Sequence, residues 1–340
     1  DIITWIKLFF TNRDAQILMG GHLSEKIMLS QGVPQGDVIS PYIFILMVEI
    51  LLIKINHTNN ITGITFAQLV SRSETFADDT TIFLERSEHN LRNTTKYITH
   101  FHSISGLACN LDKTVVIPIG TNTNIKDQLC PDLGMEWNDS FTILGFRIDS
   151  QLKQLDHNFI LVKERIKNII STWKPYNLSL RGRITIAKVK LVSQLTYTST
   201  VLDLNITLLD EIQQLINNFV MGKNADKKHW ISKDLLYTPT SQGGFGIINL
   251  HNFTKAIKCT WVKRYCIDKL DDHWADILDT FLKLTPDTRH TITQFGPERF
   301  NTIINEHIPC LSNIFSAYKT LKQHFPTGPE TLDNSWLCQP

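Results

Sequence analysis

The stretch "SETFADDTTIFLE", residues 73–85, places two adjacent aspartates between segments that suit β-strands. Thr75 and Phe76 can begin one strand, and the β-branched or large apolar residues 80–84 suit another. The Asp78–Asp79 pair lies between them, where a two-residue hairpin turn would fall. The stretch therefore predicts a β-hairpin that carries both carboxylates at an exposed tip.

Two adjacent carboxylates repel each other unless a cation neutralises them. A divalent metal such as Mg²⁺ does this, and it binds through one or two carboxylates plus the phosphates of a substrate. A solvated turn is the alternative, because Asp is common in turns. The rest of the sequence has to decide between the two.

The composition describes an ordinary globular protein with room for two or three domains. The chain has 340 residues, of which 42% are apolar and 20% charged, and its net charge is only +1. No two cysteines form a C-x-x-C pair, which argues against a zinc site, and their wide spacing argues against a disulfide scaffold. We expect reduced thiols in an intracellular, reducing compartment, with nucleus and cytoplasm not distinguished. The cysteines are Cys109, Cys130, Cys259, Cys266, Cys310 and Cys338.

The longest apolar run, residues 42–53, predicts a buried helix. It is too short to span a bilayer and is interrupted by Glu49. Ser40 is a suitable N-cap and Pro41 suits the first helical position. No signal-peptide pattern precedes it. We therefore expect no membrane partner and a helix that is apolar on most faces and packed inside the protein.

The remaining periodicity predicts an α+β fold. Residues 2–10 and 90–106 have helical patterns, the second with Leu91, Ile98, Phe101 and Ile104 inward. Strand pairs are expected around a Gly20-Gly21 turn and within residues 61–70, and short strands within 114–120 and 141–148. From about residue 157 to 222 the pattern is helical throughout, and a glycine-rich turn at 240–250 precedes a further helical region.

Charge is distributed unevenly along the chain. Residues 157–202 hold eight lysines and arginines against Glu164 alone, a net charge of +7, whereas residues 71–90 carry −3. In a helix beginning near Ser179, the cations flank one apolar stripe, where they can extend outward to phosphates. This pattern is typical of an enzyme that holds a polyanionic substrate; a solvated helix face is the alternative. The stripe is Ile184, Ala187, Leu191, Leu195 and Leu202, and the flanking cations are Arg181, Lys188, Arg183 and Lys190.

Several ordered segments together resemble the reverse transcriptases of LINE-type non-LTR retrotransposons. They are "SQGVPQGDVISPYIF", "FADD", "SGLACNLDKTVV" and "FTILGFRI", followed by "LSLRGRITIAKVKLVSQLTY" and "QGGFGIINL". The resemblance covers roughly residues 1–265. It implies part of a right-hand polymerase palm over residues 1–150, an α-helical thumb over 151–250 and a helical post-thumb region over 251–340.

The resemblance also implies roles for residues of the palm. Asp78 and Asp79 match its metal-binding aspartates, and Phe76 and Ala77 would lie beside the primer terminus. Lys113 matches a lysine near the phosphates of the nucleotide. Gln35 and Gly36 match a loop that contacts the incoming nucleotide, where glycine allows the backbone to approach closely.

Further along, Leu144 and Gly145 match a hairpin that supports the primer strand. Trp173 and Arg181 fall in the thumb that holds the template–primer duplex, as do Arg183 and the nearby lysines Lys188 and Lys190. The resemblance thus implies Mg²⁺ or Mn²⁺ as cofactor, an RNA template and a DNA primer as partners, and deoxynucleoside triphosphates as substrates.

Reverse transcriptases of this kind place a third carboxylate in an earlier segment of the type D-x-x-x-A-F-D, which we expect upstream of residue 1. We therefore expect an N-terminally truncated fragment that works with the upstream part of the same polyprotein and is inactive alone. Two other functions stay open. One is a non-catalytic nucleic-acid-binding remnant of a decayed retroelement. The other, a small metal-dependent hydrolase, has only the Asp78–Asp79 pair behind it, because no histidine accompanies that pair.

Overall fold

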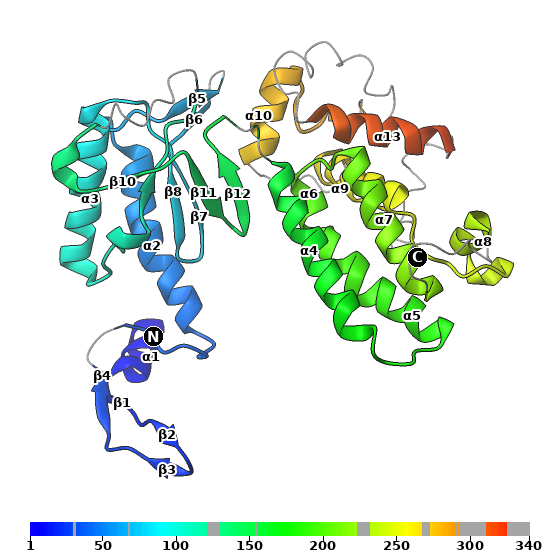
Figure 1. The fold of residues 1–340 in the computed structure, drawn as a ribbon. Coiled ribbons are helices and arrows are strands. Elements are labelled where there is room, and N and C mark those ends of the chain that lie inside the picture. The colour runs from blue at the N-terminus through cyan, green and yellow to red at the C-terminus, as the bar shows by residue number, and fades with distance from the viewer. Residues whose placement is uncertain are drawn as a thin grey trace. The chain divides into compact units, whose positions relative to one another are not determined.

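The computed structural model of the protein describes residues 1–29, 32–66, 69–120, 129–151, 153, 155–222, 232–266, 273–289, 292 and 311–324. The chain forms two compact units, Asp1–Phe141 and Thr142–Pro340, each of which is considered by itself. Figure 1 labels the elements of both units. The N-terminal unit combines helices with short strand pairs, and the described residues of the second unit are helical apart from one hairpin at its start.

The N-terminal unit begins with α1 (Ile2–Phe10), which the Asp1 carboxylate caps by accepting from Thr4 N at 2.8 Å. Four short strands follow: β1 (Arg13–Ala15), β2 (Leu18–Met19), β3 (His22–Leu23) and β4 (Ile27–Leu29). β1 pairs with β4, and β2 pairs with β3 around the predicted Gly20-Gly21 turn. The predicted helix and turn are confirmed. No side chain of α1 is buried.

Helix α2 (Ser40–His57) begins one residue away from the predicted position. Ser40 is its first helical residue, not its N-cap, and the Ser40 hydroxyl donates to Asp37 Oδ2 at 2.9 Å. The N-cap position is held by Ile39, which makes no side-chain capping bond. The hydroxyl therefore stabilises the loop that precedes the helix rather than its first turn.

The prediction that α2 is buried was wrong. Its buried residues are Ser40, Val48, Leu52 and Ile55, whereas Leu46 is 63% exposed. The main neighbours of α2 are α3 and β7, which cover one stripe of an almost uniformly apolar helix. By length and composition alone α2 could cross a membrane, a test that a helix of a soluble protein also passes.

Two antiparallel hairpins follow α2: β5 (Ile64–Phe66) with β6 (Leu69–Ser71), and β7 (Ser73–Phe76) with β8 (Asp79–Ile82). Helix α3 (Glu88–Ser105) comes next and ends at Gly106, as the pattern predicts, but it begins two residues before the predicted start, with Ser87 as its N-cap. Leu91 and Phe101 are buried, but Ile104 is 65% exposed, so the predicted inward face is one turn too long.

Short elements follow α3, and the last hairpin crosses the boundary between the two units at Phe141–Thr142. The one-turn 3₁₀ helix η1 (Leu111–Lys113) precedes β9 (Val115–Val116), and a second, η2 (Pro131–Leu133), precedes β10 (Glu136–Trp137), which pairs with β9 in parallel. β11 (Ser140–Ile143) then pairs with β12 (Phe146–Asp149). The short strands predicted within 114–120 and 141–148 are thus present.

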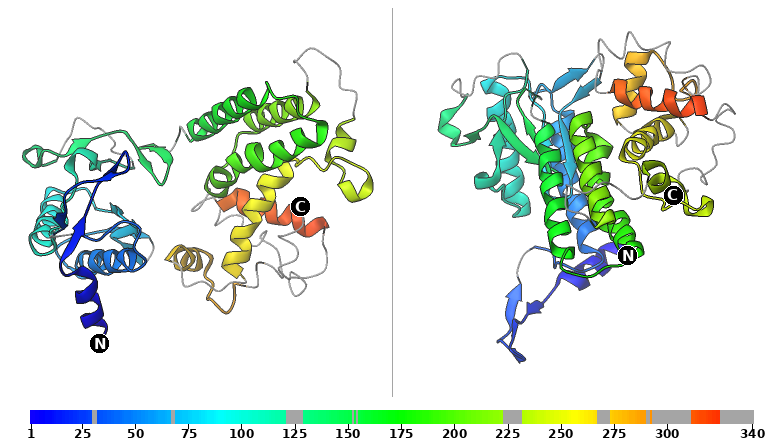
Figure 2. Two further views of the ribbon diagram at one scale, coloured as in Figure 1. Left: turned by 90° about the horizontal axis from the view of Figure 1, so that it is seen from below. Right: turned by 45° about the vertical axis from the view of Figure 1, so that its right-hand side comes forward.

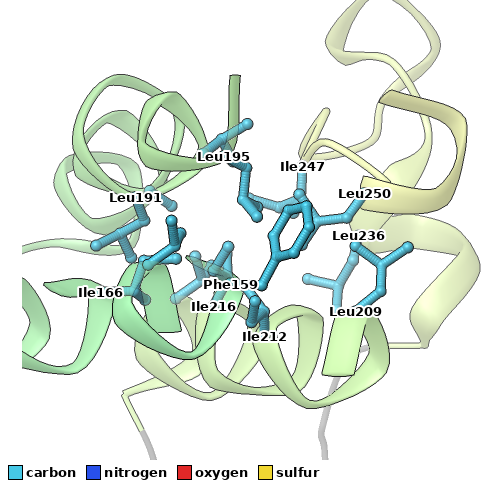
Figure 3. Close-up of a cluster of buried hydrophobic side chains, with 14 residues drawn as sticks. Phe159, Ile166, Leu191, Leu195, Leu209, Ile212, Ile216, Leu236, Ile247 and Leu250 are labelled. Carbon is cyan, nitrogen blue, oxygen red and sulfur yellow. The ribbon is translucent and has the colours of Figure 1, made fainter. Parts of the chain in front are cut away.

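The second unit is built on helices that the sequence predicts. They are α4 (Asp156–Trp173), α5 (Leu180–Ile186), the π-helical segment η3 (Ala187–Val192), α6 (Ser193–Val201) and α7 (Ile206–Met221). Figure 2 shows these helices side by side from two further directions. Ala187, Leu191 and Leu195 of the predicted stripe are buried, and Figure 3 shows Leu191 and Leu195 facing Phe159 of α4 and Ile212 of α7.

A second helical core follows in the chain. The helices α8 (Lys233–Tyr237) and η4 (Thr240–Gln242) lead into α9 (Leu250–Cys266), and α10 (His273–Leu282) and α13 (Ser312–His324) complete the described part. Val262, Tyr265 and Cys266 of α9 are buried with residues of α10 and α13. The α+β class is therefore confirmed, while the division into three parts at residues 150 and 250 stays a prediction.

Candidate active site

The aspartate hairpin has a register that differs by one residue from the predicted one. Phe76 pairs with Asp79 and Thr75 with Thr80, so the two turn residues are Ala77 and Asp78. Asp79 is the first residue of β8, not the second residue of the turn. Ala77 adopts a left-handed φ of 54°, which a tight two-residue turn requires. Turn propensity favours Asp over Ala here, but in this register the Thr75 hydroxyl donates to Asp79 O across the strand pair at 3.1 Å.

Both carboxylates are exposed at the end of this hairpin. Asp78 projects from the turn, and Asp79 shares one face of the strand pair with Phe76, which is 67% exposed. Among the described residues no basic side chain forms an ion pair with either aspartate. Two exposed carboxylates whose charge no basic side chain neutralises suit a divalent cation that also binds substrate phosphates. Within the same described ranges, no group of three or more His, Cys, Asp or Glu side chains could hold a metal.

The base of the hairpin is fixed by residues that sequence reasoning missed. Arg72 donates to the carbonyl oxygens of Ile61 and Asn56 at 3.0 and 2.7 Å, and Ser73 Oγ donates to Asn56 Oδ1 at 3.0 Å. The side chain of Asn90, which is 2% exposed, accepts from Thr62 N. The contacts of Arg72 and Ser73 hold the base of the hairpin to the end of α2, and the contact of Asn90 ties the segment before β5 to the start of α3. A lone Arg or Asn in the sequence carries no signal for such a role.

Gln35 and Gly36 lie in an exposed turn before α2, and Gly36 has a φ of 90° that favours glycine. In Figure 1 the β7–β8 hairpin runs alongside α2, with its turn toward the end where α2 begins. The base of β7 contacts Asn56, about 24 Å from Ser40 along the helix. Five strand residues span about 16 Å, which is less than that length of helix. Contact of Gln35 or Gly36 with a nucleotide stays a prediction.

Lys113 ends the single turn η1 and is exposed. Its backbone N–H donates to Asn110 O at 3.1 Å, which fixes the turn and leaves the ammonium group in solvent. Within the described part of the chain no hydrogen bond or ion pair joins this side chain to the aspartates. Its role beside nucleotide phosphates therefore stays a prediction.

The second predicted hairpin turn is present at Leu144 and Gly145. Both residues have positive φ, 47° and 78°, as a two-residue turn between β11 and β12 requires. The Leu144 side chain is 39% exposed. This turn lies at the start of the helical unit and is available to a ligand.

Arg183 makes structural contacts within the helical unit, and its predicted binding to a duplex stays a prediction. Its Nε donates to Val220 O at 2.6 Å and its Nη1 donates to Leu178 O at 2.7 Å. Val220 lies in the last turn of α7, so the guanidinium satisfies carbonyls at a helix end and complements the dipole there. A duplex phosphate would have to compete with these bonds.

Other cations of the helical unit differ in how far they are available. Arg181 and Lys190 are exposed, whereas Lys188 is half-buried, with its Nζ near Gly246. Trp173 is half-buried beside Tyr176, with 5.6 Å between ring centroids.

Two lysines counted in the local charge are already paired. Lys163 pairs with Glu211, which lies outside the counted range, and Lys167 pairs with Glu164 at 2.6 Å. The positive charge that faces solvent is therefore smaller than the +7 of the sequence.

Comparison with known proteins defines the class. Residues 1–148 match the family model described as reverse transcriptase (RNA-dependent DNA polymerase). This range contains the aspartate hairpin, the Gln35–Gly36 turn and most of the β11–β12 hairpin. The N-terminal part of the chain is therefore similar to reverse transcriptases.

Two of the relatives come from transposable elements, and with the family match they confirm the resemblance to the reverse transcriptases of non-LTR retrotransposons. The chain is 20% identical over 289 residues to the transposon TX1 uncharacterized 149 kDa protein of Xenopus laevis, covering 83% of this chain and 21% of the relative. It is 30% identical over 105 residues to a Pol polyprotein from the type-1 retrotransposable element R2 of Popillia japonica, covering 31% and 14%. A putative ribonuclease H protein of Arabidopsis thaliana is 28% identical over 98 residues, covering 28% and 16%. The chain spans about a fifth or less of the length of these relatives.

Proposed function

We propose that this chain is the RNA-directed DNA polymerase region of a non-LTR retrotransposon polyprotein, with Asp78 and Asp79 as its metal-binding carboxylates. The observation that carries the proposal is the β7–β8 hairpin, whose tip presents two exposed carboxylates without a cationic partner among the described residues. That hairpin lies within the residues that match the reverse transcriptase family. A solvated turn would need no such anchoring of its base by Arg72 and Ser73.

The neighbouring residues would bind and orient the substrates. Phe76 lies opposite Asp79 on the same strand face and offers an exposed ring to the terminal primer nucleotide. The turn at Gln35 and Gly36 would offer backbone groups to the incoming nucleotide. The ammonium group of Lys113 would place a positive charge beside the phosphates of that nucleotide. When bound, Mg²⁺ or Mn²⁺ would neutralise the phosphates and activate the primer hydroxyl.

We further propose that the helical unit is the thumb and holds the template–primer duplex through phosphates. The exposed Arg181 and Lys190 are the cations best placed for this, and Trp173 adds an aromatic surface. Lys188 contributes less, because it is half-buried beside the 240–250 loop. Such contacts carry no sequence information.

A salt titration of duplex binding tests the thumb assignment. Replacing both Arg181 and Lys190 with Ala should lower the slope of log K against log salt by about 1.8 if each contacts one phosphate. The matched control replaces both Lys163 and Lys167 with Ala. This double variant removes the same formal charge, but from lysines that are already paired with glutamates. Equal slopes for the two double variants would contradict the assignment.

Primer extension tests the catalytic assignment. We propose that the chain alone does not extend a primer on RNA with Mg²⁺ or Mn²⁺, because two carboxylates leave the metal at the primer hydroxyl short of a ligand. Fusing an upstream segment from a related element should restore synthesis, and Asp78→Ala should then abolish it. Duplex binding without extension in the fused protein would favour the alternative, a non-catalytic nucleic-acid-binding remnant.

A further inference from the structure

The turn at Leu144 and Gly145 is fastened to the helical bundle by Tyr197 of α6. The Tyr197 hydroxyl donates to Leu144 O at 2.6 Å. Its ring stacks on Phe146, with 4.8 Å between centroids and 29° between planes, and Phe146 is 6% exposed. A Cβ at Gly145 would lie 4.0 Å from Tyr197 Cε1, so the ring lies directly against the turn.

Asn158 of α4 fastens the second strand of the same hairpin. Its Oδ1 accepts from Arg147 N at 2.8 Å, and its Nδ2 donates to Arg147 O at 2.9 Å and to Leu155 O at 3.1 Å. The side chain is buried, and its amide pairs with Arg147 as a neighbouring strand would. Because a buried polar group must be satisfied, this pairing fixes where β12 lies on α4.

The hydrogen bonds of Tyr197 and Asn158 join the turn and the second strand of the hairpin to the helices of the second unit. The family match extends to residue 148 and includes the turn, whereas the compact helical unit begins at Thr142. A hairpin that belongs to the polymerase segment by sequence is thus bonded to two helices that follow it in the chain, α4 and α6. Any motion of the bundle would carry the turn with it.

We propose that Tyr197 and Asn158 are positioning residues that make the Leu144–Gly145 turn and the helical bundle one rigid body acting on the primer strand. The proposal rests on the proposed function for the contact between turn and primer. It predicts that the bundle and the turn grip the primer together: loss of Tyr197 or Asn158 leaves the duplex bound by the bundle but lets the turn lose its place at the primer terminus.

The test uses the full chain with Tyr197→Phe, which removes only the hydroxyl, and Asn158→Leu, which removes the amide. Tyr237→Phe is the matched control, because the Tyr237 hydroxyl bonds Asn217 in the same unit at 2.8 Å and does not touch the hairpin. An RNA template with a DNA primer ending in 4-thiothymidine is bound, and affinity is measured by fluorescence anisotropy. Cross-links to the peptide containing residues 144–147 are then quantified, and hydrogen exchange of the same peptide is followed without duplex.

Tyr197→Phe should keep duplex affinity within about twofold. The yield of the cross-link at residues 144–147 should fall about fivefold, because one neutral hydrogen bond shifts the population of the positioned turn by about that factor. The rate of hydrogen exchange in the same peptide should rise by a similar factor. Asn158→Leu should change both the cross-link yield and the exchange rate more than Tyr197→Phe does. Tyr237→Phe should change neither quantity. Unchanged exchange and cross-linking in Tyr197→Phe and Asn158→Leu would overturn the inference. If the unaltered chain does not bind the duplex, the proposed function fails and the primer role with it, and exchange alone decides the fastening.

Discussion

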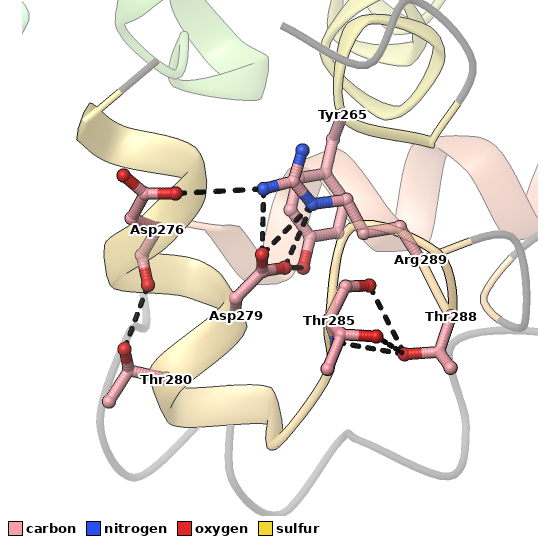
Figure 4. A network of polar contacts seen from close by, with 7 residues as sticks. All are labelled: Tyr265, Asp276, Asp279, Thr280, Thr285, Thr288 and Arg289. Atoms are coloured by element: carbon pink, nitrogen blue, oxygen red, sulfur yellow. Dashed lines mark hydrogen bonds and ion pairs between the residues drawn. The ribbon is translucent and has the colours of Figure 1, made fainter. Parts of the chain in front are cut away.

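The sharpest stability prediction concerns a buried ion pair in the second helical core. Arg289 donates to both carboxylate oxygens of Asp279, with Nη2 at 2.6 Å from Oδ2 and Nε at 2.9 Å from Oδ1. The Tyr265 hydroxyl donates to the same carboxylate, and the guanidinium lies 4.9 Å from the Tyr265 ring centroid. Figure 4 shows these three side chains converging from α9, α10 and the segment after α10. The side chains of Arg289 and Asp279 are 2% and 10% exposed.

Arg289→Met should destabilise this core by about 3–5 kcal/mol, because it leaves a buried carboxylate without its cation. The double variant Arg289→Met, Asp279→Leu should recover most of that loss, since apolar residues of similar volume replace a buried pair with neutral or even favourable effect. The coupling between the two sites, rather than either single value, measures the pair.

Urea unfolding of the full chain, with hydrogen exchange of peptides from α9 and α10, provides the assay. Arg264→Met is the matched control: Arg264 is an exposed arginine of α9 that lies over the Trp261 ring, and its loss should change stability by no more than about 0.5 kcal/mol. If Arg289→Met costs no more than this control, or if the double variant is no more stable than Arg289→Met, the network does not stabilise the core.

Three further outcomes are expected. Burial raises the pKa of the Cys266 thiol from 9.0 to about 12, so the folded state holds this proton more tightly than the unfolded state. Its contribution is complete below about pH 9 and is lost as pH rises toward 12, and Cys266→Ala should flatten the fall of the urea midpoint in that window. Arg183→Met should cost about 1.5–3 kcal/mol, because its bonds to two carbonyls are charge-assisted, whereas Arg181→Ala should cost almost nothing in the same unfolding assay. In α2, Leu52→Ala should cost about 2–5 kcal/mol and Leu46→Ala no more than about 0.5, as measured by exchange of α2 peptides; equal costs would mean that α2 is covered on both faces.

Several elements could be predicted from the sequence because their causes are local. Asp1 caps α1 and Gly106 ends α3 through contacts within one helical turn. The Gly20-Gly21 and Leu144–Gly145 turns join strands that are neighbours in the chain. The segments that carry the family resemblance are likewise short and ordered along the chain. Periodicity, caps and turn chemistry act over a few residues, so they can be read without knowing the fold.

Other features were decided only by contacts between distant segments. The register of the aspartate hairpin follows the Thr75–Thr80 pairing rather than turn propensity, and α2 is half exposed because one stripe alone meets α3 and β7. Arg183 has the same charge as Arg181, yet its partner Val220 lies 37 residues away.

The order of short motifs along the chain gave the resemblance to reverse transcriptases, and periodicity predicted the helices of the second unit and both hairpins. Contacts between distant segments set which cations remain available, which side of α2 is covered, and how Asn158 and Tyr197 hold the Leu144–Gly145 turn. A side chain's hydrogen-bonding partner and its burial depend on what other segments bring to it, and residue type and spacing do not encode that information locally.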